Sequence, residues 1–434
     1  MKLERFATAL ASVTARMAAI GWKARRLASP VLATCIALGT LPAQGADPPS
    51  TGLSRAEVRR QVAILRTLGQ AMFADPSLSG SGQVACASCH DPSHAFGPPN
   101  ALPVQLAGSD MRQPGVRAVP SLRYLQVVPP FSEHFYDSED DADESVDNGP
   151  TGGLTWDGRA DLGADQARIP LLSPFEMANA GPHEVVQQAL KAGYGDALRA
   201  VYGEAVLADE DRIFAGITKA FEVFEQDWRA FYPYSSKYDA YLAGEATLTP
   251  QEARGLELFE DPAKGNCAEC HVSQRGFDGT PPQFTDFGLI AIGLPRNPAI
   301  PANADPAYFD LGLCGPLRRD FTDRKDYCGL FRTPTLRNVA VRRTFFHNGV
   351  FHSLRQAVQF YAQRDTNPER FYPRDAQGIV QKFDDLPAEY WANLNTDPPF
   401  DRHAGDTPAL SDTEIDDVVA FLGTLTDGYR DVGD

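Results

Sequence analysis

The sequence is poor in basic residues, and this excludes several classes of partner. Its 434 residues include 40 Lys and Arg against 57 Asp and Glu, which gives a net charge of −17 at pH 7. Nucleic acids and anionic membrane surfaces attract proteins through positive patches. We therefore expect no nucleic-acid partner and no anionic membrane surface, whereas basic partners suit this charge.

The apolar stretch nearest the N-terminus is too short to span a bilayer. It covers about residues 30–41, and a transmembrane helix needs roughly 20 apolar residues. A basic region precedes it and small residues follow, which is the order of an export signal. We predict a signal peptide over residues 1–46, cleaved near Gly45–Ala46, and a periplasmic mature protein without a transmembrane segment. Leu32–Cys35 loosely resembles a lipoprotein box, but the Thr beside Cys35 fits poorly.

Cysteine is also scarce, and the position of each residue is informative. Of seven Cys, one lies in the predicted leader and four lie in two short motifs, Cys86–His90 and Cys267–His271. The remaining pair is Cys314 and Cys328. In an oxidising compartment we expect these two to form a disulfide, worth about 3 kcal/mol in the chain-entropy model. The alternative is a pair of buried free thiols.

The two short motifs share one pattern. Cys86–His90 reads Cys-Ala-Ser-Cys-His, and Cys267–His271 reads Cys-Ala-Glu-Cys-His. Cys-x-x-Cys-His is the attachment signature of c-type haem, in which both thiols form thioethers and the imidazole binds the iron. A zinc or disulfide motif with a chance His explains one copy better than two. We predict two covalent haem c groups, held by Cys86, Cys89, His90, Cys267, Cys270 and His271.

Methionine, a usual sixth ligand of electron-carrying c-type haem, is absent after Met177. The second haem must therefore take another ligand or none. The candidates are a Tyr, a Lys, an open position, or one of His347, His352 and His403.

The sixth position of the first haem is less restricted by composition. Met111 and His134 are available, and an open position is the third possibility. His94 follows His90 too closely to reach the opposite face. An iron closed on both sides only passes electrons, whereas an open iron can bind a substrate such as peroxide.

Helical patterns and loop-rich segments alternate in the same order in both halves. We predict a mostly α fold of two cytochrome c-like domains, each with one covalently bound haem c, long loops and few short strands. The boundaries are 47–240 for the first domain and 241–434 for the second. The predicted helices cover 54–72, 184–202, 209–231, 251–259 and 412–425. An acidic run at 137–144 is typical of a solvated loop, although docking of a basic partner or a cation also suits it.

Four further segments carry a family resemblance. They are Thr-Trp-Asp-Gly-Arg-Ala at 155–160, Ser-Pro-Phe-Glu-Met at 173–177, Phe-Arg-Thr-Pro-Thr-Leu-Arg-Asn-Val at 331–339 and Phe-His-Asn-Gly at 346–349. Together they resemble the bacterial dihaem cytochrome c peroxidase/MauG family over nearly the whole mature chain. The resemblance implies an oxidoreductase of the cytochrome c peroxidase type that uses hydrogen peroxide. It also implies a peroxidatic N-terminal haem and a C-terminal haem that relays or stores oxidising equivalents.

The resemblance assigns three catalytic residues. Gln166 and Glu176 match the pair that lines the family's peroxide pocket, and Trp156 matches the tryptophan between the two haems. A desolvated carboxyl with a raised pKa suits the proton transfer that peroxide cleavage needs. Taken alone, Glu176 would be a solvated residue after a turn and Trp156 a core residue.

Tyr361 is the residue that separates the two branches of the family. It lies fourteen residues after His347, where the peroxidases have Met and MauG-like members have Tyr. The absence of Met in this half agrees with that match. A phenolate is a hard anionic ligand that lowers the reduction potential relative to Met. Taken alone, Tyr361 would be a packed residue of a helix.

The sequence departs from the family at several positions. The distal His of the classical peroxidases is missing near Asp110 and Met111, which implies a first site open without reductive activation, with Met111 as an alternative cap. Pro170 stands where MauG-like proteins have a distal Pro. MauG also has a surface Trp before its second motif, where this chain has Gly265.

The calcium site of the family is altered as well. Ala118 replaces the Asn that supplies a ligand, and the partner carbonyls would belong to Arg342 and Thr344. Losing an oxygen ligand and gaining a cationic side chain both oppose a divalent cation. We expect the Arg342 guanidinium to replace calcium.

These observations favour a periplasmic dihaem peroxidase of the MauG-like type, in which oxidising charge from hydrogen peroxide is shared between two haems. The expected partners are hydrogen peroxide and either a small redox protein that donates electrons or a protein substrate. One alternative is a protein-modifying oxidase that acts on Trp or Tyr of a partner. A non-catalytic dihaem electron carrier is the other, but it needs a second strong ligand on each iron.

Overall fold

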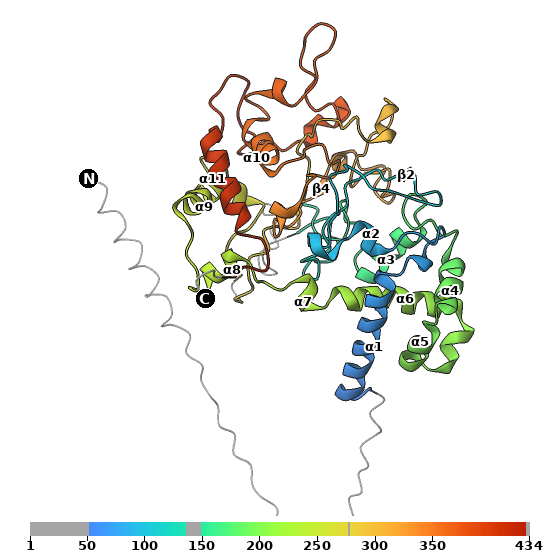
Figure 1. The fold of residues 1–434 in the computed structure, drawn as a ribbon. Coiled ribbons are helices and arrows are strands. Elements are labelled where there is room, and N and C mark those ends of the chain that lie inside the picture. Colours follow the sequence, from blue (N-terminus) through green and yellow to red (C-terminus); the bar gives the residue numbers. More distant parts are fainter. Residues whose placement is uncertain (1–51, 136–148, 277, 431–434) are drawn as a thin grey trace, which may run out of the picture. The chain divides into compact units, whose positions relative to one another are not determined.

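Two pairs of crossing helices organise the chain. In the first half α1 (Arg55–Phe73) packs on α6 (Glu210–Glu225), and in the second half α9 (Pro250–Glu260) packs on α11 (Asp412–Gly423). Figure 1 shows the first pair in the blue-to-green part of the ribbon and the second in the yellow-to-red part.

The computed structural model describes residues 52–135, 149–276 and 278–430. The predicted signal peptide at 1–46 and the acidic run at 137–144 lie outside the described residues.

A glycine allows the close approach of the helices in each pair. A Cβ atom on Gly69 would lie 2.0 Å from the carbonyl oxygen of Ala220, and one on Gly255 would lie 2.0 Å from that of Asp417. Any side chain at either position would therefore push the helices apart. One turn after each contact, two phenylalanine rings meet edge to face. These pairs are Phe73 with Phe224 at 5.4 Å and Phe259 with Phe421 at 5.2 Å between centroids.

A third helix packs on the second member of each pair. In the first half α3 (Gly163–Leu172) packs on α6, and in the second half α10 (Leu354–Gln363) packs on α11. Neither α3 nor α10 was among the predicted helices. The other α-helices are α2 (Cys86–Cys89), α4 (Pro182–Lys191), α5 (Gly195–Tyr202), α7 (Trp228–Phe231) and α8 (Lys237–Leu242).

Two helices predicted as continuous are each divided in two. The predicted helix 184–202 breaks at Gly193, whose φ of 89° ends α4 before α5 begins. The predicted helix 209–231 breaks after α6, where the Asp227 carboxylate accepts the backbone N–H of Arg229 and starts α7. A left-handed glycine and a local N-cap therefore override the apolar periodicity.

The strands are short and lie in two antiparallel pairs. β1 (Leu106–Ala107) pairs with β2 (Gln113–Pro114), with Leu106 opposite Pro114. β3 (Leu289–Ile290) pairs with β4 (Phe331–Arg332), with Leu289 opposite Arg332. The prediction of a mostly helical protein with few short strands is confirmed.

The hydrophobic residues form separate cores in the two halves. The first core extends from Leu65 to Phe231 and the second begins at Tyr238, close to the predicted boundary at 240/241, which stays a prediction. A third, smaller cluster surrounds Cys314 and Cys328, which form a disulfide as the cysteine count predicts.

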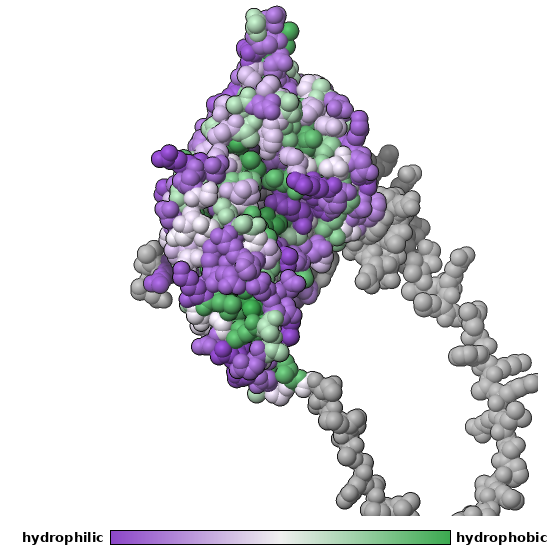
Figure 2. Space-filling view, turned by 90° about the vertical axis from the view of Figure 1, so that its right-hand side faces the viewer, coloured by the Kyte–Doolittle hydropathy of each residue, from purple (hydrophilic) through white to green (hydrophobic). Residues whose placement is uncertain are grey.

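Surface character agrees with the charge of the sequence. On the face shown in Figure 2 hydrophilic residues predominate, and hydrophobic residues gather in smaller patches between them. None of the helices that the structure describes has both the length and the apolar character needed to cross a bilayer.

Candidate active site

The histidines of both motifs are oriented by main-chain carbonyl groups. Nδ1 of His90 lies 3.0 Å from the Phe96 oxygen, and Nδ1 of His271 lies 2.9 Å from the Phe284 oxygen. Burial lowers the pKa of His90 to about 4 and also lowers that of His271, so both rings are neutral at pH 7. An N–H donated from Nδ1 leaves Nε2 unprotonated, as a metal ligand requires.

The two carbonyl groups occupy matching backbone positions. Phe96 and Phe284 both have φ of 54°, a left-handed value that is uncommon for a bulky residue. Each carbonyl oxygen accepts a second hydrogen bond from the chain, from Leu122 N–H at 3.2 Å and Leu336 N–H at 3.3 Å respectively. The surrounding structure therefore fixes both acceptors.

Two similar loops supply those second hydrogen bonds. Residues 120–123 read Pro-Ser-Leu-Arg and residues 334–337 read Pro-Thr-Leu-Arg. The Ser121 hydroxyl donates to the Ala95 carbonyl at 2.6 Å, and the Thr335 hydroxyl donates to the Gln283 carbonyl at 2.6 Å. Sequence reasoning missed this repeat, although the two Pro-x-Leu-Arg segments could have revealed it.

The first cavity, of about 400 Å³, brings together the residues predicted for peroxide chemistry. Its lining includes the motif residues Cys86, Cys89 and His90 together with Trp156, Gln166, Pro170 and Glu176. The first turn of α3 places Gln166 on the wall and its last turn places Pro170 there. The turn after α3 places Glu176 on the same wall.

Glu176 has a buried carboxyl oxygen without a partner. Among the described residues no hydrogen bond reaches its Oε2 atom. Its backbone is held at both ends, by the Ser173 carbonyl at 3.1 Å and the Gly108 N–H at 2.9 Å. Burial raises the pKa of Glu176. A buried carboxyl group with a raised pKa and a free oxygen atom is suited to take up and release a proton.

Met111 and His94 do not belong to this cavity wall. The Met111 sulfur accepts a hydrogen bond from Ser81 Oγ at 3.8 Å, and Met111 is not among the described residues that line the cavity. His94 is paired with Asp91 at 2.9 Å instead.

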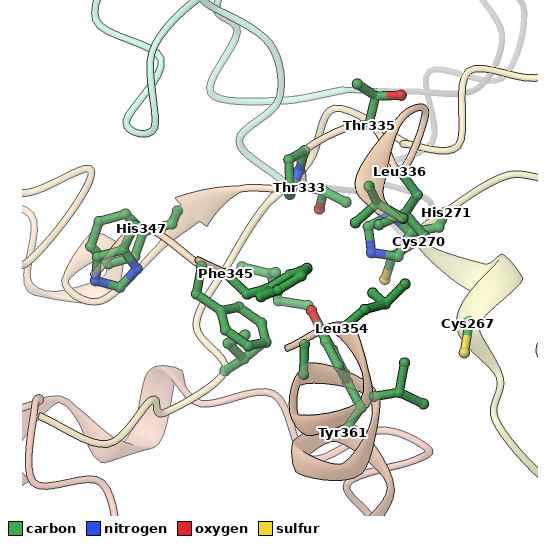
Figure 3. Close-up of a pocket in the computed structure, with 18 of the residues that line it drawn as sticks. Cys267, Cys270, His271, Thr333, Thr335, Leu336, Phe345, His347, Leu354 and Tyr361 are labelled. Atoms are coloured by element: carbon green, nitrogen blue, oxygen red, sulfur yellow. The ribbon is translucent and has the colours of Figure 1, made fainter. Parts of the chain in front are cut away.

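The second cavity, of about 220 Å³, brings Tyr361 together with Cys267, Cys270 and His271. Tyr361 is on α10, which begins where Ser353 Oγ accepts the Gln356 N–H at 3.2 Å. In Figure 3 the phenol extends from the helix into the cavity, with its oxygen toward His271 and Cys270.

The Tyr361 hydroxyl has no hydrogen-bond partner among the described residues, and burial raises its pKa. Of the alternative histidines, only His347 also lines this cavity among the described residues. His347 is stacked on Phe331 at 3.4 Å between centroids, and His352 and His403 are exposed. Tyr361 is half-buried and presents to the cavity a phenol oxygen that has no partner among the described residues, which fits a metal ligand.

Trp156 lies between the two cavities. It lines both of them, and its indole N–H donates to the Ala118 carbonyl at 2.8 Å. Arg332 also lines both cavities, which sequence reasoning did not foresee. Its Nε donates to the Thr155 carbonyl at 3.1 Å, and no carboxylate pairs with it among the described residues. This buried cation is suited to an anionic group of a ligand, such as a carboxylate.

Polar groups of the chain meet near Ala118, where the family resemblance predicts an altered calcium site. The Arg342 guanidinium donates to the Thr344 carbonyl at 3.2 Å and to the Val119 carbonyl at 3.1 Å. Burial lowers the pKa of Arg342 to about 10, so the group remains charged at neutral pH. The Ala118 N–H donates to the His347 carbonyl at 2.7 Å.

Comparisons with known proteins agree with this geometry. The family model for di-haem cytochrome c peroxidase matches residues 65–247. MauG, a methylamine utilization protein of Paracoccus denitrificans, is 34% identical over 84% of this chain and 88% of its own length. The chain belongs to the dihaem cytochrome c peroxidase/MauG family. It is a peroxidase-type oxidoreductase, as the sequence predicts.

Solved structures support the same assignment for this dihaem peroxidase. The diheme peroxidase BthA of Burkholderia thailandensis is 42% identical, with a TM-score of 0.72 over 84% of this chain and 86% of that one. A variant of BthA with a tyrosine replaced by methionine gives a TM-score of 0.75 at the same coverage. A cytochrome c551 peroxidase of Pseudomonas aeruginosa is 27% identical over 73% of this chain and 76% of its own length.

The residues of both cavities fit the two haem c groups that a dihaem peroxidase carries. The four motif thiols are free of disulfides, and each pair lines a cavity together with a histidine whose Nε2 is available. The chain thus offers two thioether sites and two proximal ligands.

Proposed function

We propose that this protein is a periplasmic, MauG-like dihaem peroxidase that uses hydrogen peroxide at the first site and keeps the second iron closed by Tyr361. The difference between the two cavities carries the proposal. Among the described residues, no hydrogen bond reaches the buried Glu176 Oε2 atom in the first cavity, and none reaches the phenol oxygen of Tyr361 in the second.

The two motifs would hold the haems. Cys86 and Cys89 would form the thioethers of the first haem, with His90 Nε2 as its ligand. Cys267 and Cys270 would do the same for the second, and His271 and Tyr361 would be its iron ligands. When bound, the haems supply one iron that reacts with peroxide and another that exchanges electrons.

Glu176 would move the proton that peroxide cleavage requires. Its carboxylate takes a proton from one oxygen of peroxide and delivers it to the other, which leaves as water. Burial raises the pKa of Glu176, which makes its carboxylate a stronger proton acceptor than an ordinary glutamate.

Gln166 and Trp156 would act beside that proton transfer. The Gln166 amide is on the same wall and can donate a hydrogen bond to peroxide without changing charge. Trp156 offers an oxidisable ring between the two cavities, and its hydrogen bond to Ala118 fixes the ring plane. A fixed Trp156 ring would keep the distance between the two sites and the ring constant from one turnover to the next.

Calcium is not part of the proposed enzyme. The Arg342 guanidinium already bonds to the Thr344 carbonyl, one of the two that would face the ion, and Ala118 has no oxygen in its side chain. A dication beside a buried guanidinium is disfavoured by charge. Metal analysis showing about one calcium per chain, with activity lost upon its removal, would contradict this.

The reductant is proposed to be a small basic redox protein. The net charge of −17 attracts such a donor, and the predicted acidic run at 137–144 would contribute. Oxidation of a protein substrate in the manner of MauG would need another exit for the electrons, because Gly265 stands where MauG has its surface tryptophan. A Cβ atom there would lie 2.6 Å from the Leu258 carbonyl oxygen, so the backbone has no room for a tryptophan.

Addition of hydrogen peroxide to the purified diferric protein tests the proposal. We expect the Soret and near-infrared spectra to change without prior reduction, and a long-lived state oxidised by two electrons. Reduced cytochrome c should be consumed slowly. Rapid turnover that requires prior reduction would contradict the MauG-like assignment and favour a classical peroxidase.

A further inference from the structure

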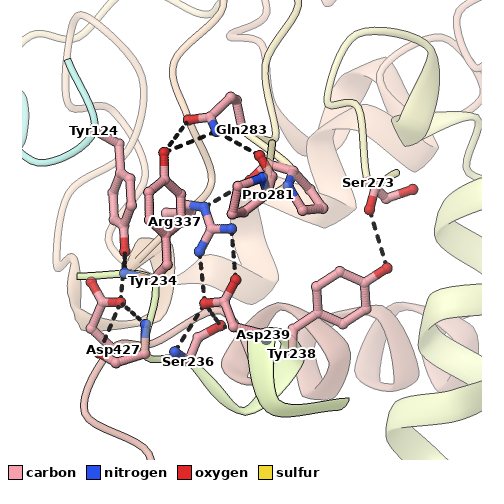
Figure 4. Close-up of polar contacts among 12 residues, drawn as sticks. Tyr124, Tyr234, Ser236, Tyr238, Asp239, Ser273, Pro281, Gln283, Arg337 and Asp427 are labelled. Atoms are coloured by element: carbon pink, nitrogen blue, oxygen red, sulfur yellow. Dashed lines mark hydrogen bonds and ion pairs between the residues drawn. The ribbon is translucent and has the colours of Figure 1, made fainter. Parts of the chain in front are cut away.

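The two Pro-x-Leu-Arg loops beside the proximal histidines meet at Asp427. Oδ1 of Asp427 accepts the Tyr124 hydroxyl at 2.7 Å, and Oδ2 accepts the Asn338 side-chain amide at 2.7 Å. Arg123 also donates to Oδ2 at 2.8 Å. Figure 4 shows Tyr124 and Asp427 in this network. The side chain of Asp427 is only 4% exposed, so water does not compete for these bonds.

Short paths, made of hydrogen bonds and of two-residue stretches of backbone, connect this carboxylate to both motifs. On one side, His90 and the Leu122 N–H share the Phe96 oxygen, and Tyr124 is two residues after Leu122. On the other, His271 shares the Phe284 oxygen with Leu336, two residues before Asn338. Tyr124 is therefore an oxidisable residue at the point where the chain segments that orient His90 and His271 come together.

The Tyr124 phenol can lose an electron only together with its proton. The residue is 1% exposed, and burial followed by the charge of Asp427 raises the pKa of its hydroxyl well above the ordinary value. The phenol is thus protonated at every physiological pH. Since a tyrosine radical cation is a strong acid, the carboxylate at 2.7 Å is a ready acceptor.

The surroundings favour a neutral radical over a charged one. The Arg337 guanidinium lies over the rings of Tyr124 and Tyr234 at 4.8 and 4.7 Å. This cation would repel a radical cation but has little effect on a neutral phenoxyl. Arg337 is itself held by both oxygens of Asp239 at 2.9 Å, so it cannot move away.

We propose that Tyr124 and Asp427 form a third redox site, at which one oxidising equivalent from peroxide is held as a neutral tyrosyl radical. Tyr124 gives one electron to the oxidised centre, which is reduced by one. Its phenolic proton passes to Oδ1 of Asp427. An electron from the reductant later restores the phenol, and the proton returns from Asp427. The inference rests on the proposed peroxidase function.

Neighbouring tyrosines offer a path by which an oxidising equivalent can leave Tyr124. The Tyr234 ring is 5.1 Å from Tyr124, and the Tyr232 ring is 6.5 Å from Tyr234. Tyr124 is buried, whereas Tyr234 and Tyr232 are partly exposed. Oxidising equivalents can therefore leave toward solvent, which would protect the haems when no reductant is present.

Freeze-quench EPR of the holoenzyme after peroxide addition tests the site. We expect a tyrosyl radical in the wild type and its loss in Tyr124→Phe. The matched control is Tyr238→Phe, because Tyr238 is equally buried but donates to the Ser273 carbonyl, which is no proton acceptor, at 3.2 Å. It should retain the signal. A radical that persists in Tyr124→Phe would overturn the proposal.

Asp427→Asn tests the proton acceptor. It should abolish the radical although Tyr124 is present, and a radical of wild-type yield would overturn the role of Asp427. Circular dichroism melting shows whether the Asp427→Asn variant is folded. If it is not folded, the Tyr124→Phe result alone tests the proposal.

Oxidation by a photo-excited ruthenium complex, without peroxide, separates the two proposals. If peroxide leaves the haem spectra of the wild type unchanged, the peroxidase function fails. Photo-oxidation still shows whether the radical forms at Tyr124 or at another tyrosine.

Discussion

The two halves of this enzyme share a framework and differ in the helix that packs against it. Both have a crossing pair with a glycine at the contact, and both orient the histidine through a phenylalanine carbonyl. In the first half α3 and the turn after it supply Gln166 and Glu176, and in the second α10 supplies Tyr361. Equivalent frames therefore support the proposed acid–base site in one half and the proposed iron ligand in the other.

The difference shows which parts of the molecule can diverge. Glycine contacts and main-chain acceptors position a haem whatever chemistry it performs. The third helix lies over the cavity without being part of the crossing, so its side chains can change while the frame is kept. The four predictions below test this division between frame and third helix.

Replacing Tyr361 should have the largest effect, confined to the second half. Tyr361→Phe removes the phenol, so the spectrum of the second haem should change while the first still responds to peroxide. Tyr361→Met should raise the potential of the second haem, within the roughly 0.8 V range over which axial ligands act. Spectroelectrochemistry measures both.

Tyr372→Phe is the control for Tyr361. Tyr372 is buried in the same half, and its hydroxyl donates to the Gly293 carbonyl. This variant should leave both haem spectra as they are. An unchanged second-haem spectrum in Tyr361→Phe would refute the ligand assignment.

Glu176→Gln should slow the reaction with peroxide by about 10²- to 10⁴-fold, the usual contribution of a general acid–base. In the wild type the rate should rise with pH as Glu176 loses its proton. Because burial raises the pKa of Glu176, the midpoint should lie above the range of an ordinary glutamate. Stopped-flow measurements at several pH values give both results.

Glu225→Gln provides a matched control in the same cavity wall. Burial raises the pKa of Glu225 to about 8, but it is on α6 rather than in the turn after α3. The variant should retain the rate of the wild type. If Glu176→Gln and Glu225→Gln slow the reaction equally, the proton transfer is not specific to Glu176 and the proposed role of the turn after α3 is wrong.

Removal of the disulfide should destabilise only the second half. Cys314→Ala with Cys328→Ala opens a loop of 14 residues, which costs about 3 kcal/mol in the chain-entropy model. A calorimetric scan should show a lower Tm for the double variant. A reductant should lower the Tm of the wild type but leave that of the variant unchanged. Equal Tm values would indicate that the third core holds this loop without the bond.

Alanine at the helix contacts should have the smallest of these effects. Gly69→Ala and Gly255→Ala each place a Cβ atom 2.0 Å from a carbonyl oxygen, and overpacking of this kind costs about 1–3 kcal/mol. Gly423→Ala is the control, since nothing lies within 4 Å of its Cβ position. Denaturant melts followed at each haem show whether the damage stays in one half.

From the sequence, the candidate site residues could be predicted better than the long-range contacts that hold them in position. The motif spacing indicated both haem sites, and the fourteen residues from His347 to Tyr361 indicated a residue that the structure places beside His271. The roles of Glu176, Gln166, Trp156 and Tyr361 remain predictions. These features were accessible because each depends on residue type at a fixed local separation.

Other features could not be predicted, because they depend on distant pairs or on the main chain. Tyr124 and Asp427 are 303 residues apart, and nothing local in either segment indicates the other. The helix break at Gly193 depends on a left-handed glycine within a good apolar pattern. The acceptors at Phe96 and Phe284 are carbonyl groups, which every residue has.

Those two carbonyl groups have a consequence for how the protein tolerates mutation. No substitution can delete a main-chain oxygen, so a saturation scan of Phe96 and Phe284 would record the cost of a left-handed backbone and of lost packing rather than the removal of the acceptor atom. Orientation of the imidazoles is in this sense less exposed to side-chain replacement than an orientation set by a side-chain acceptor. An insertion or a deletion in these loops would displace the acceptor directly.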